Sequence, residues 1–131
     1  MSSFCVMPFY SQENRRFDIT PCCLLAANTD IPKLKQDFLN GERPADCQKC
    51  WNVENAGELS RRVLVNQAIT DRYKCTEEQI LQDCKEGKNK IILYQLTTSN
   101  LCDQACVTCG SQCSTKWAEL ESRAGKKTFP L

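Results

Sequence analysis

Apolar residues at helical spacing mark a first predicted helix at residues 30–41. Asp30 is a capping residue, Pro32 falls in the first turn, where proline fits, and Gly41 is a stop signal. The apolar positions between them recur every three or four residues, as on one face of an amphipathic helix. A helix here would bring together cysteines that precede and follow it in the sequence.

A second helical pattern lies within residues 67–90. Thr76 and Gln79 have the spacing of a capping box, apolar residues follow on one face, and Gly87 is a stop signal. We therefore predict that residues 67–90 form a connecting helix between the parts of the chain that carry the grouped cysteines.

The apolar run at residues 91–96 has the length and composition of a short buried strand. It leads into a polar turn at residues 97–100 and then into a loop that contains cysteines. Residues 114–125 are rich in strong helix formers and end in glycine, which predicts a helix after the loop. This strand, loop and helix make up the third predicted part of the chain, residues 91–131.

Charge and hydropathy narrow the class of protein without indicating a partner. Charged residues make up 25% of the 131 residues, the net charge is +1, and no apolar run approaches the length of a membrane span. The arginine pairs at 15–16 and 61–62 are too small for a nucleic-acid-binding patch. The N-terminus lacks the basic and apolar regions of an export signal. We therefore expect a cytoplasmic protein with no nucleic-acid partner and no membrane partner.

Cysteine is the residue type that carries the candidate chemistry. The chain has 11 cysteines and no histidine. The odd count, the missing export signal and the C-x2-C and C-x3-C-x2-C spacings favour metal binding over disulfides. Without histidine, the remaining candidates are iron–sulfur or zinc sites with thiolate ligands. Cys75 and Cys84 lie outside any ligand spacing, and we expect both to be structural.

The first predicted part, residues 1–66, has enough cysteines for one closed four-thiolate site. The candidate ligands are Cys5, Cys22, Cys47 and Cys50, with Cys23 as an alternative to Cys22. On spacing alone, these thiols could hold an iron–sulfur cluster or form a zinc knot. The two C-x2-C pairs of the chain are too far apart in sequence for a single zinc ribbon to join them.

The third part holds a different arrangement of thiols. Cys102, Cys106 and Cys109 have a C-x3-C-x2-C spacing, which supplies three ligands to a [4Fe–4S] cluster and leaves one iron without a protein ligand. A small molecule could coordinate the open iron and receive an electron. Cys113 could instead close the cluster as a fourth ligand, which would make the chain an electron-transfer protein.

The strand, cysteine loop and helix of residues 91–131 resemble the start of a radical S-adenosylmethionine (radical SAM) domain. The resemblance implies that Cys102, Cys106 and Cys109 hold a [4Fe–4S] cluster that binds S-adenosylmethionine and cleaves it reductively to a 5′-deoxyadenosyl radical. Thr108 stands where many members have an aromatic residue. The family's barrel repeats the strand-and-helix unit several times, so we expect no turnover without a missing C-terminal barrel half.

The first part is similar to the SPASM and twitch auxiliary-cluster modules of radical SAM enzymes. The matching motifs are Phe4-Cys5 with Pro8-Phe9, Thr20-Pro21-Cys22-Cys23, residues 38–44, Cys47-Gln48-Lys49-Cys50-Trp51, and residues 54–57. The resemblance implies a second, auxiliary [4Fe–4S] cluster on the four thiols of residues 1–66 and a peptide as substrate. Such modules usually have glycine where this chain has Phe17, so we predict that the turn of their small hairpin shifts to Glu13–Asn14.

The predicted fold class is therefore α+β. A small cysteine-rich metal module with a β-hairpin and helices precedes the first strand–loop–helix unit of a truncated radical SAM (β/α) barrel. An incomplete barrel would expose apolar strand residues such as Ile91, Ile92 and Leu93, and Trp117 is expected in a core or an interface. The alternatives left open are a closed-cluster electron-transfer protein and a zinc-binding structural module.

Overall fold

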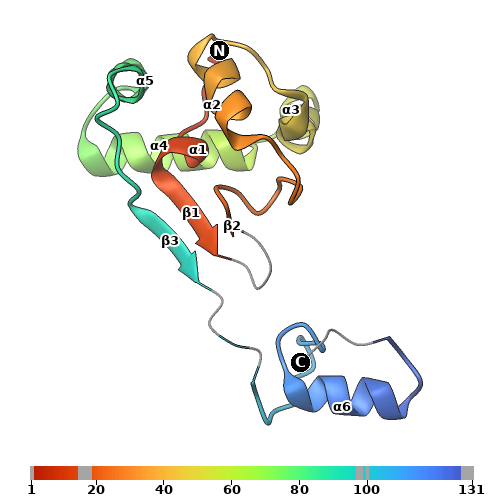
Figure 1. Ribbon diagram of the computed structural model, residues 1–131. Coiled ribbons are helices and arrows are strands. Elements are labelled where there is room, and N and C mark those ends of the chain that lie inside the picture. Colours follow the sequence, from red (N-terminus) through yellow and green to blue (C-terminus); the bar gives the residue numbers. More distant parts are fainter. Residues whose placement is uncertain (1, 15–18, 97–98, 100, 128–131) are drawn as a thin grey trace. The chain divides into compact units, whose positions relative to one another are not determined.

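The computed structural model describes residues 2–14, 19–96, 99 and 101–127, and within these residues the fold is α+β (Figure 1). In chain order the elements are α1 (Met7–Tyr10), β1 (Ser11–Asn14), β2 (Ile19–Thr20), α2 (Ile31–Leu39), the 3-10 helix η1 (Ala45–Cys47), α3 (Gln48–Asn55), α4 (Arg61–Tyr73), α5 (Glu77–Lys85), β3 (Leu93–Leu96) and α6 (Thr115–Arg123). The chain divides into two compact units, Met1–Leu96 and Thr97–Leu131, and each is described by itself.

The helices α2 and α5 have the ends that the sequence predicts. The Asp30 side chain accepts a hydrogen bond from the Lys33 N–H at 3.1 Å, and Gly41 follows the helix with a φ of +79°. At the start of α5, Thr76 and Gln79 form a complete capping box. The helix predicted at residues 30–41 and the capping box predicted at Thr76 and Gln79 are therefore both confirmed. Each helix has start and stop signals within its own sequence.

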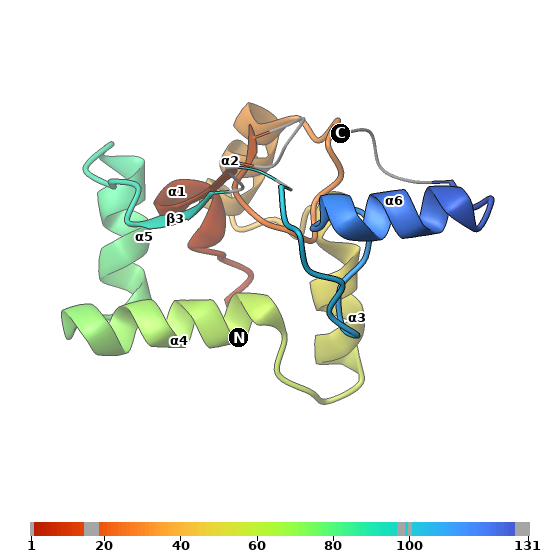
Figure 2. The same ribbon diagram turned by 90° about the horizontal axis from the view of Figure 1, so that it is seen from below.

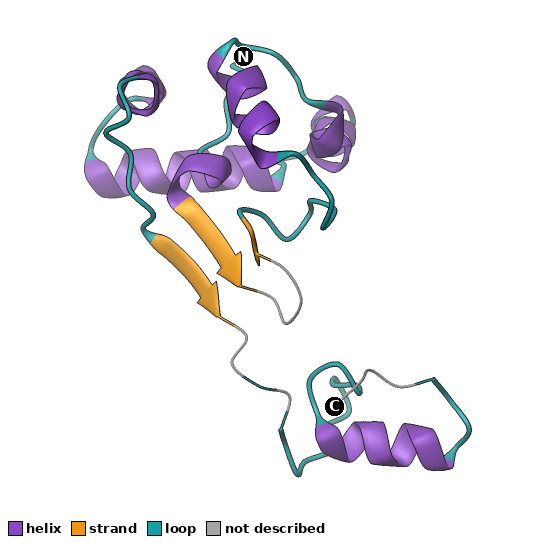
Figure 3. Ribbon diagram, viewed as in Figure 1, coloured by secondary structure: helices purple, strands orange, loops and turns teal. Residues whose placement is uncertain are grey.

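The three strands form one sheet in the order β2-β1-β3 (Figure 3). β1 and β2 are an antiparallel hairpin in which Glu13 lies opposite Thr20 and Asn14 opposite Ile19, whereas β3 runs parallel to β1 on its other side. A hairpin is therefore present, but the predicted turn at Glu13–Asn14 is wrong, because both residues continue the strand. Phe17 and the rest of the connection lie outside the described residues.

Strand β3 differs from the buried strand predicted at residues 91–96. All four of its residues are exposed, with Tyr94 at 62% and Leu96 at 63%. The physical reason is that β1 is the one described element that packs extensively against β3, so the side chains on both faces of the strand remain uncovered. Of the three residues for which the sequence predicts exposure, Leu93 is exposed, whereas Ile91 and Ile92 are half-buried. Most of the predicted turn at 97–100 lies outside the described residues.

The core of the first unit is built around its N-terminal segment. Phe4, Val6 and Phe9 are each at most 3% exposed, and the rings of Phe4 and Phe9 lie 5.6 Å apart. Helix α4 runs along this unit, with α3 near its N-terminal end and α5 near its C-terminal end (Figures 1 and 2). Further core residues from α2, α3, α4 and α5 are Leu34, Phe38, Trp51, Ile69 and Ile80. The N-terminal segment therefore packs into the same core as helices that are distant from it in sequence.

The division of the chain differs from the three predicted parts. The predicted boundary at residue 66 falls inside α4, so residues 67–90 contain the end of α4 and all of α5 instead of one connecting helix. Strand β3 belongs to the first unit through its pairing with β1, so the break follows Leu96 and not residue 90.

The second unit contains helix α6 after the cysteine loop. Ser114 caps the helix by accepting a hydrogen bond from the Trp117 N–H at 3.3 Å, so the helix predicted at residues 114–125 is confirmed. No helix in the part of the chain that the structure describes is both long enough and apolar enough to cross a membrane.

Candidate functional site

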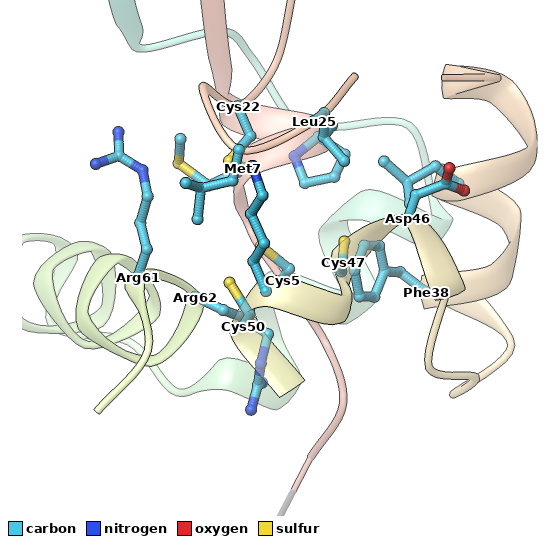
Figure 4. A pocket seen from close by; sticks show the side chains of 14 residues that line it. Cys5, Met7, Cys22, Leu25, Phe38, Asp46, Cys47, Cys50, Arg61 and Arg62 are labelled. Carbon is cyan, nitrogen blue, oxygen red and sulfur yellow. The ribbon is translucent and has the colours of Figure 1, made fainter. Parts of the chain in front are cut away.

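Four cysteines of the first unit line one pocket (Figure 4). Cys5 precedes α1, Cys22 follows β2, Cys47 closes η1, and Cys50 lies in the first turn of α3. The segments that carry them are separated along the chain, and the packing of the first unit brings them to one place. These are the four residues that sequence spacing groups into one site.

The pKa values of these thiols reflect both burial and their mutual proximity. Burial is the main cause of the raised pKa of Cys5, and the neighbouring thiols of Cys47, Cys22 and Cys50 raise it further. Burial, followed by the thiols of Cys50 and Cys22, raises the pKa of Cys47 to about 12. In the absence of a metal, Cys5 and Cys47 are therefore protonated at neutral pH. A metal would replace these protons and stabilise the thiolates.

Several groups around the pocket favour the thiolate form, although Asp46, which also lines it, raises the pKa of Cys47. The Met7 N–H donates a hydrogen bond to the Cys5 sulfur, and the Leu24 N–H donates one to Cys22. The Arg61 guanidinium lowers the pKa of Cys22, although burial raises it more strongly. N–H groups and cations near sulfur ligands are what an anionic thiolate–metal centre requires.

Helix α4 holds the backbone on both sides of Cys5. The Val6 N–H donates to Asn66 Oδ1 at 2.9 Å, and Asn66 Nδ2 donates to the Phe4 carbonyl at 2.8 Å. Arg62 Nη1 donates to the same carbonyl at 2.8 Å. Asn66 and Arg62 are 3% and 4% exposed, so these bonds are shielded from water. They fix the position from which the Cys5 side chain enters the pocket.

Arg62 also connects α4 with α3, the helix of Cys50. Its Nε and Nη2 donate to the two carboxylate oxygens of Glu54 at 2.9 and 2.8 Å. The guanidinium lies 5.1 Å from the centre of the Trp51 ring, and Trp51 Nε1 donates to the Pro44 carbonyl at 2.8 Å. These contacts fix α3 and the chain that leads into it, where Cys47 lies.

The rest of the pocket wall is mostly apolar. Met7, Pro8, Leu25, Leu34 and Phe38 line it together with the thiols. The space open to water is about 20 Å³, inside a hollow of about 450 Å³ that includes solvent at its mouth. Among the described residues, no three cysteine or acidic side chains are arranged as the ligands of a single metal ion. The four thiols therefore share a pocket without converging on one point.

In the second unit, the backbone of the cysteine loop is bonded to the start of α6. Thr115 Oγ1 donates to the Cys102 carbonyl at 2.9 Å, and Ser114 Oγ donates to the Gln104 carbonyl at 2.6 Å. Trp117 Nε1 donates to the Cys106 carbonyl at 2.8 Å. Trp117 is half-buried. The sequence predicts this residue in a core or an interface, and in the structure its indole N–H bonds to the backbone of the cysteine loop.

The thiols of this loop are accessible. Cys102 is half-buried, whereas Cys106 and Cys109 are exposed. Cys113 is also exposed and precedes the Ser114 cap, so it lies outside α6, with its N–H bonded to the Gly110 carbonyl at 3.0 Å. The donor set of the loop fits a cluster that a small molecule can approach.

The remaining cysteines of the first unit have different environments. Cys84 is part of the hydrophobic core and Cys75 packs against it, which agrees with their predicted structural role. Burial raises the pKa of Cys84 to about 11, and the Tyr10 hydroxyl hydrogen bonds to its thiol. Cys23 is exposed and is absent from the lining of the pocket, which favours Cys22 over Cys23 as the candidate ligand.

The residues that hold Cys5 in place were missed from the sequence. Arg62, Asn66 and Ile69 are the buried residues of α4, and their spacing of four and three residues is that of one helix face. A search for apolar residues at helical spacing does not reveal this face, because two of its three buried residues, Arg62 and Asn66, are polar. Their partners in α3 and the N-terminal segment are not visible in any local pattern.

No protein-family model matches this sequence, and neither the curated proteins nor the solved structures contain a match.

Proposed function

We propose that this chain is an iron–sulfur protein of the radical SAM type that binds two [4Fe–4S] clusters. Cys102, Cys106 and Cys109 would hold the cluster that binds S-adenosylmethionine, and the four thiols of the first unit would hold an auxiliary cluster. The observation that carries the proposal is that Cys5, Cys22, Cys47 and Cys50, from separate segments, line one pocket. Thiolates in this number are the usual ligands of such clusters.

The C-x3-C-x2-C loop in the same chain favours a cluster over a single zinc ion at the four thiols, because both resemblances imply iron–sulfur chemistry. At a zinc–sulfur distance of about 2.3 Å, tetrahedral ligands lie about 3.8 Å apart and converge on one point. The described thiols are not arranged in this way. A four-iron cluster places irons and sulfides between its ligands and so needs more widely spaced thiols. Because the space open to water among the four cysteines is only about 20 Å³, their side chains would have to rotate outward to admit a cluster.

The loop of the second unit would present its three thiols to a cluster with one open iron. When bound, this cluster supplies the electron that cleaves S-adenosylmethionine to methionine and a 5′-deoxyadenosyl radical, which takes hydrogen from the substrate. The chain's own contribution is to hold the loop backbone through Ser114, Thr115 and Trp117. The exposure of Cys106 and Cys109 leaves room for the small molecule.

A peptide is the substrate class that we propose, by analogy with the auxiliary-cluster modules that the first unit resembles. A polypeptide that supplies the remaining barrel is the proposed partner. Large apolar side chains are exposed in each unit, namely Leu96 in β3, and Leu101 and Val107 in the cysteine loop at 81% and 97%. Such side chains are expected where a further polypeptide packs.

Anaerobic reconstitution with iron and sulfide, followed by iron counting and electron paramagnetic resonance, tests the proposal. We expect about eight irons per chain and a signal from the reduced protein that changes when S-adenosylmethionine is added. Cys109→Ser should lose about four irons and the response, whereas Cys47→Ser should lose about four irons and keep it. The matched control Cys113→Ser should behave as the unaltered protein.

Three results would contradict the proposal. Iron loss in Cys113→Ser would mean a closed cluster and an electron-transfer protein. A colourless protein that contains zinc would mean a structural module. A protein with about four irons or none, and no response to S-adenosylmethionine, would rule out an open iron in this chain.

A further inference from the structure

A buried arginine connects two of the segments that carry candidate cluster ligands. Arg62 is 4% exposed, and burial of a guanidinium is costly unless its hydrogen-bonding groups are satisfied. Its donors reach the carbonyls of Ser2 and Phe4 and the carboxylate of Glu54. The side chain also lines the pocket of the four thiols.

We propose that Arg62 is a positioning residue for the auxiliary cluster, that it locks the Cys5 segment to the helix of Cys50, and that its charge raises the reduction potential of the cluster. This inference rests on the proposed function, because it assumes that a cluster occupies the pocket. Arg62 would not be a ligand of the cluster. Its two effects, on the position of the ligands and on the reduction potential, can be measured separately.

The positioning effect follows from the planar shape of the guanidinium. One edge binds both oxygens of Glu54, in the same helix as Cys50, while Nη1 donates to the carbonyl of Phe4, the residue before Cys5. A lysine ammonium is a single point and cannot reproduce this fork. Arg62→Lys should therefore keep the charge and lose the connection.

The electrostatic effect follows from where the two charges of the ion pair lie. Arg62 lines the pocket, whereas Glu54 is absent from its lining. The pKa of Glu54 is lowered, chiefly by its hydrogen bonds to Arg62, so the carboxylate is ionised and the pair is a true ion pair. Of the two partners, only the cation belongs to a residue that forms part of the pocket wall, and a positive charge near a cluster favours the form with one more electron.

The test measures the reduction potential and iron retention of the auxiliary cluster in a Cys109→Ser background, which removes the second cluster. Arg62→Lys should keep a potential close to that of the parent but release iron to a chelator more readily, by about tenfold or more. Arg62→Met should show the same loss of retention and a more negative potential. Arg43→Met is the matched control, since Arg43 stacks on Trp51 at 4.6 Å but does not line the pocket.

Removal of Arg62 alone leaves Glu54 partly buried without its partner, so the double variant Arg62→Met/Glu54→Gln separates charge from misfolding. It should still show a more negative potential than the parent. An unchanged potential in both methionine variants would overturn the electrostatic effect. Unchanged iron retention in Arg62→Lys would overturn the positioning effect.

A measurement on the cluster-free protein keeps the inference separate from the proposed function. Cys5 and Cys84 are both buried, at 7% and 6% exposure, and only Cys5 is next to a residue that Arg62 holds. Alkylation followed by mass spectrometry should show faster labelling of Cys5 in Arg62→Lys, with Cys84 unchanged. Equal acceleration at both sites would mean general unfolding and would overturn the positioning role. If the unaltered protein binds no iron, the proposed function fails, while this labelling still decides the role of Arg62.

Discussion

Asn66→Ala should destabilise the first unit far more than the loss of one amide side chain on a surface. The side chain accepts from the Val6 N–H and donates to the Phe4 carbonyl and to Glu77 Oε2. Alanine leaves the Val6 N–H buried without this acceptor, which costs about 1–3 kcal/mol. The lost bond to Phe4 adds about 0.5–1.5 kcal/mol, because Arg62 still satisfies that carbonyl. The sum is about 1.5–4.5 kcal/mol.

Urea and thermal unfolding of the cluster-free full chain, followed by circular dichroism, measure this effect. For a unit of this size, a loss of about 1.5–4.5 kcal/mol corresponds to a fall in melting temperature of about 7–23 °C. Asn52→Ala is the matched control, since Asn52 is exposed and its Oδ1 accepts a hydrogen bond from Gln48 Nε2 within the same helix, α3. We expect the control to lie within about 0.5 kcal/mol of the unaltered protein.

A stability of Asn66→Ala within about 0.5 kcal/mol of the unaltered protein would refute the reasoning. It would mean that the Val6 N–H finds another acceptor, and that α4 does not fix the backbone beside Cys5. A large loss in Asn66→Ala together with an equal loss in Asn52→Ala would also refute it, because burial would then not be the cause.

Three further predictions concern the thiols and the cysteine loop. The pKa of Cys47 is raised from 9.0 to about 12, so between these pH values the folded cluster-free protein keeps a proton that the unfolded chain loses. The free energy of unfolding of the cluster-free protein should therefore fall between pH 9 and 12, and it should fall less steeply in Cys47→Ser. Cys22→Ser should lose about four irons on reconstitution, whereas Cys23→Ser should lose none. Ser114→Ala removes the cap of α6 and its bond to the Gln104 carbonyl, so iron should be retained less well in the loop and equally well in the first unit.

The parts of the fold that the sequence predicts are those with local signals. The helices α2, α5 and α6 each have a capping side chain that bonds to a backbone N–H three residues later. The information for these ends lies within a few residues, so a single sequence is sufficient. The grouping of Cys5, Cys22, Cys47 and Cys50 was also accessible, because clustered thiols indicate a shared site.

The errors concern features that depend on contacts between distant segments. Glu13 and Asn14 have no strong strand preference, but pairing with Thr20 and Ile19 on one side and with β3 on the other makes them a strand. The apolar run at 91–96 predicts burial, but the residues of β3 are exposed because β1 is the one described element that packs extensively against them. The roles of Arg62 and Asn66 require knowledge that the N-terminal segment packs on α4, about 60 residues away in sequence.

The parallel pairing of β3 with β1 has a consequence for synthesis on the ribosome. The Asn89 amide donates to the Phe9 carbonyl across 80 residues of chain, and the strands pair in register with Ser11 opposite Leu93. N-terminal segments emerge first, and contacts between distant residues form slowly. Until residue 96 has left the exit tunnel, one side of β1 has no partner strand and can pair with another nascent chain. A polypeptide ended before Leu93 would contain every cysteine of the pocket and would still be prone to aggregate.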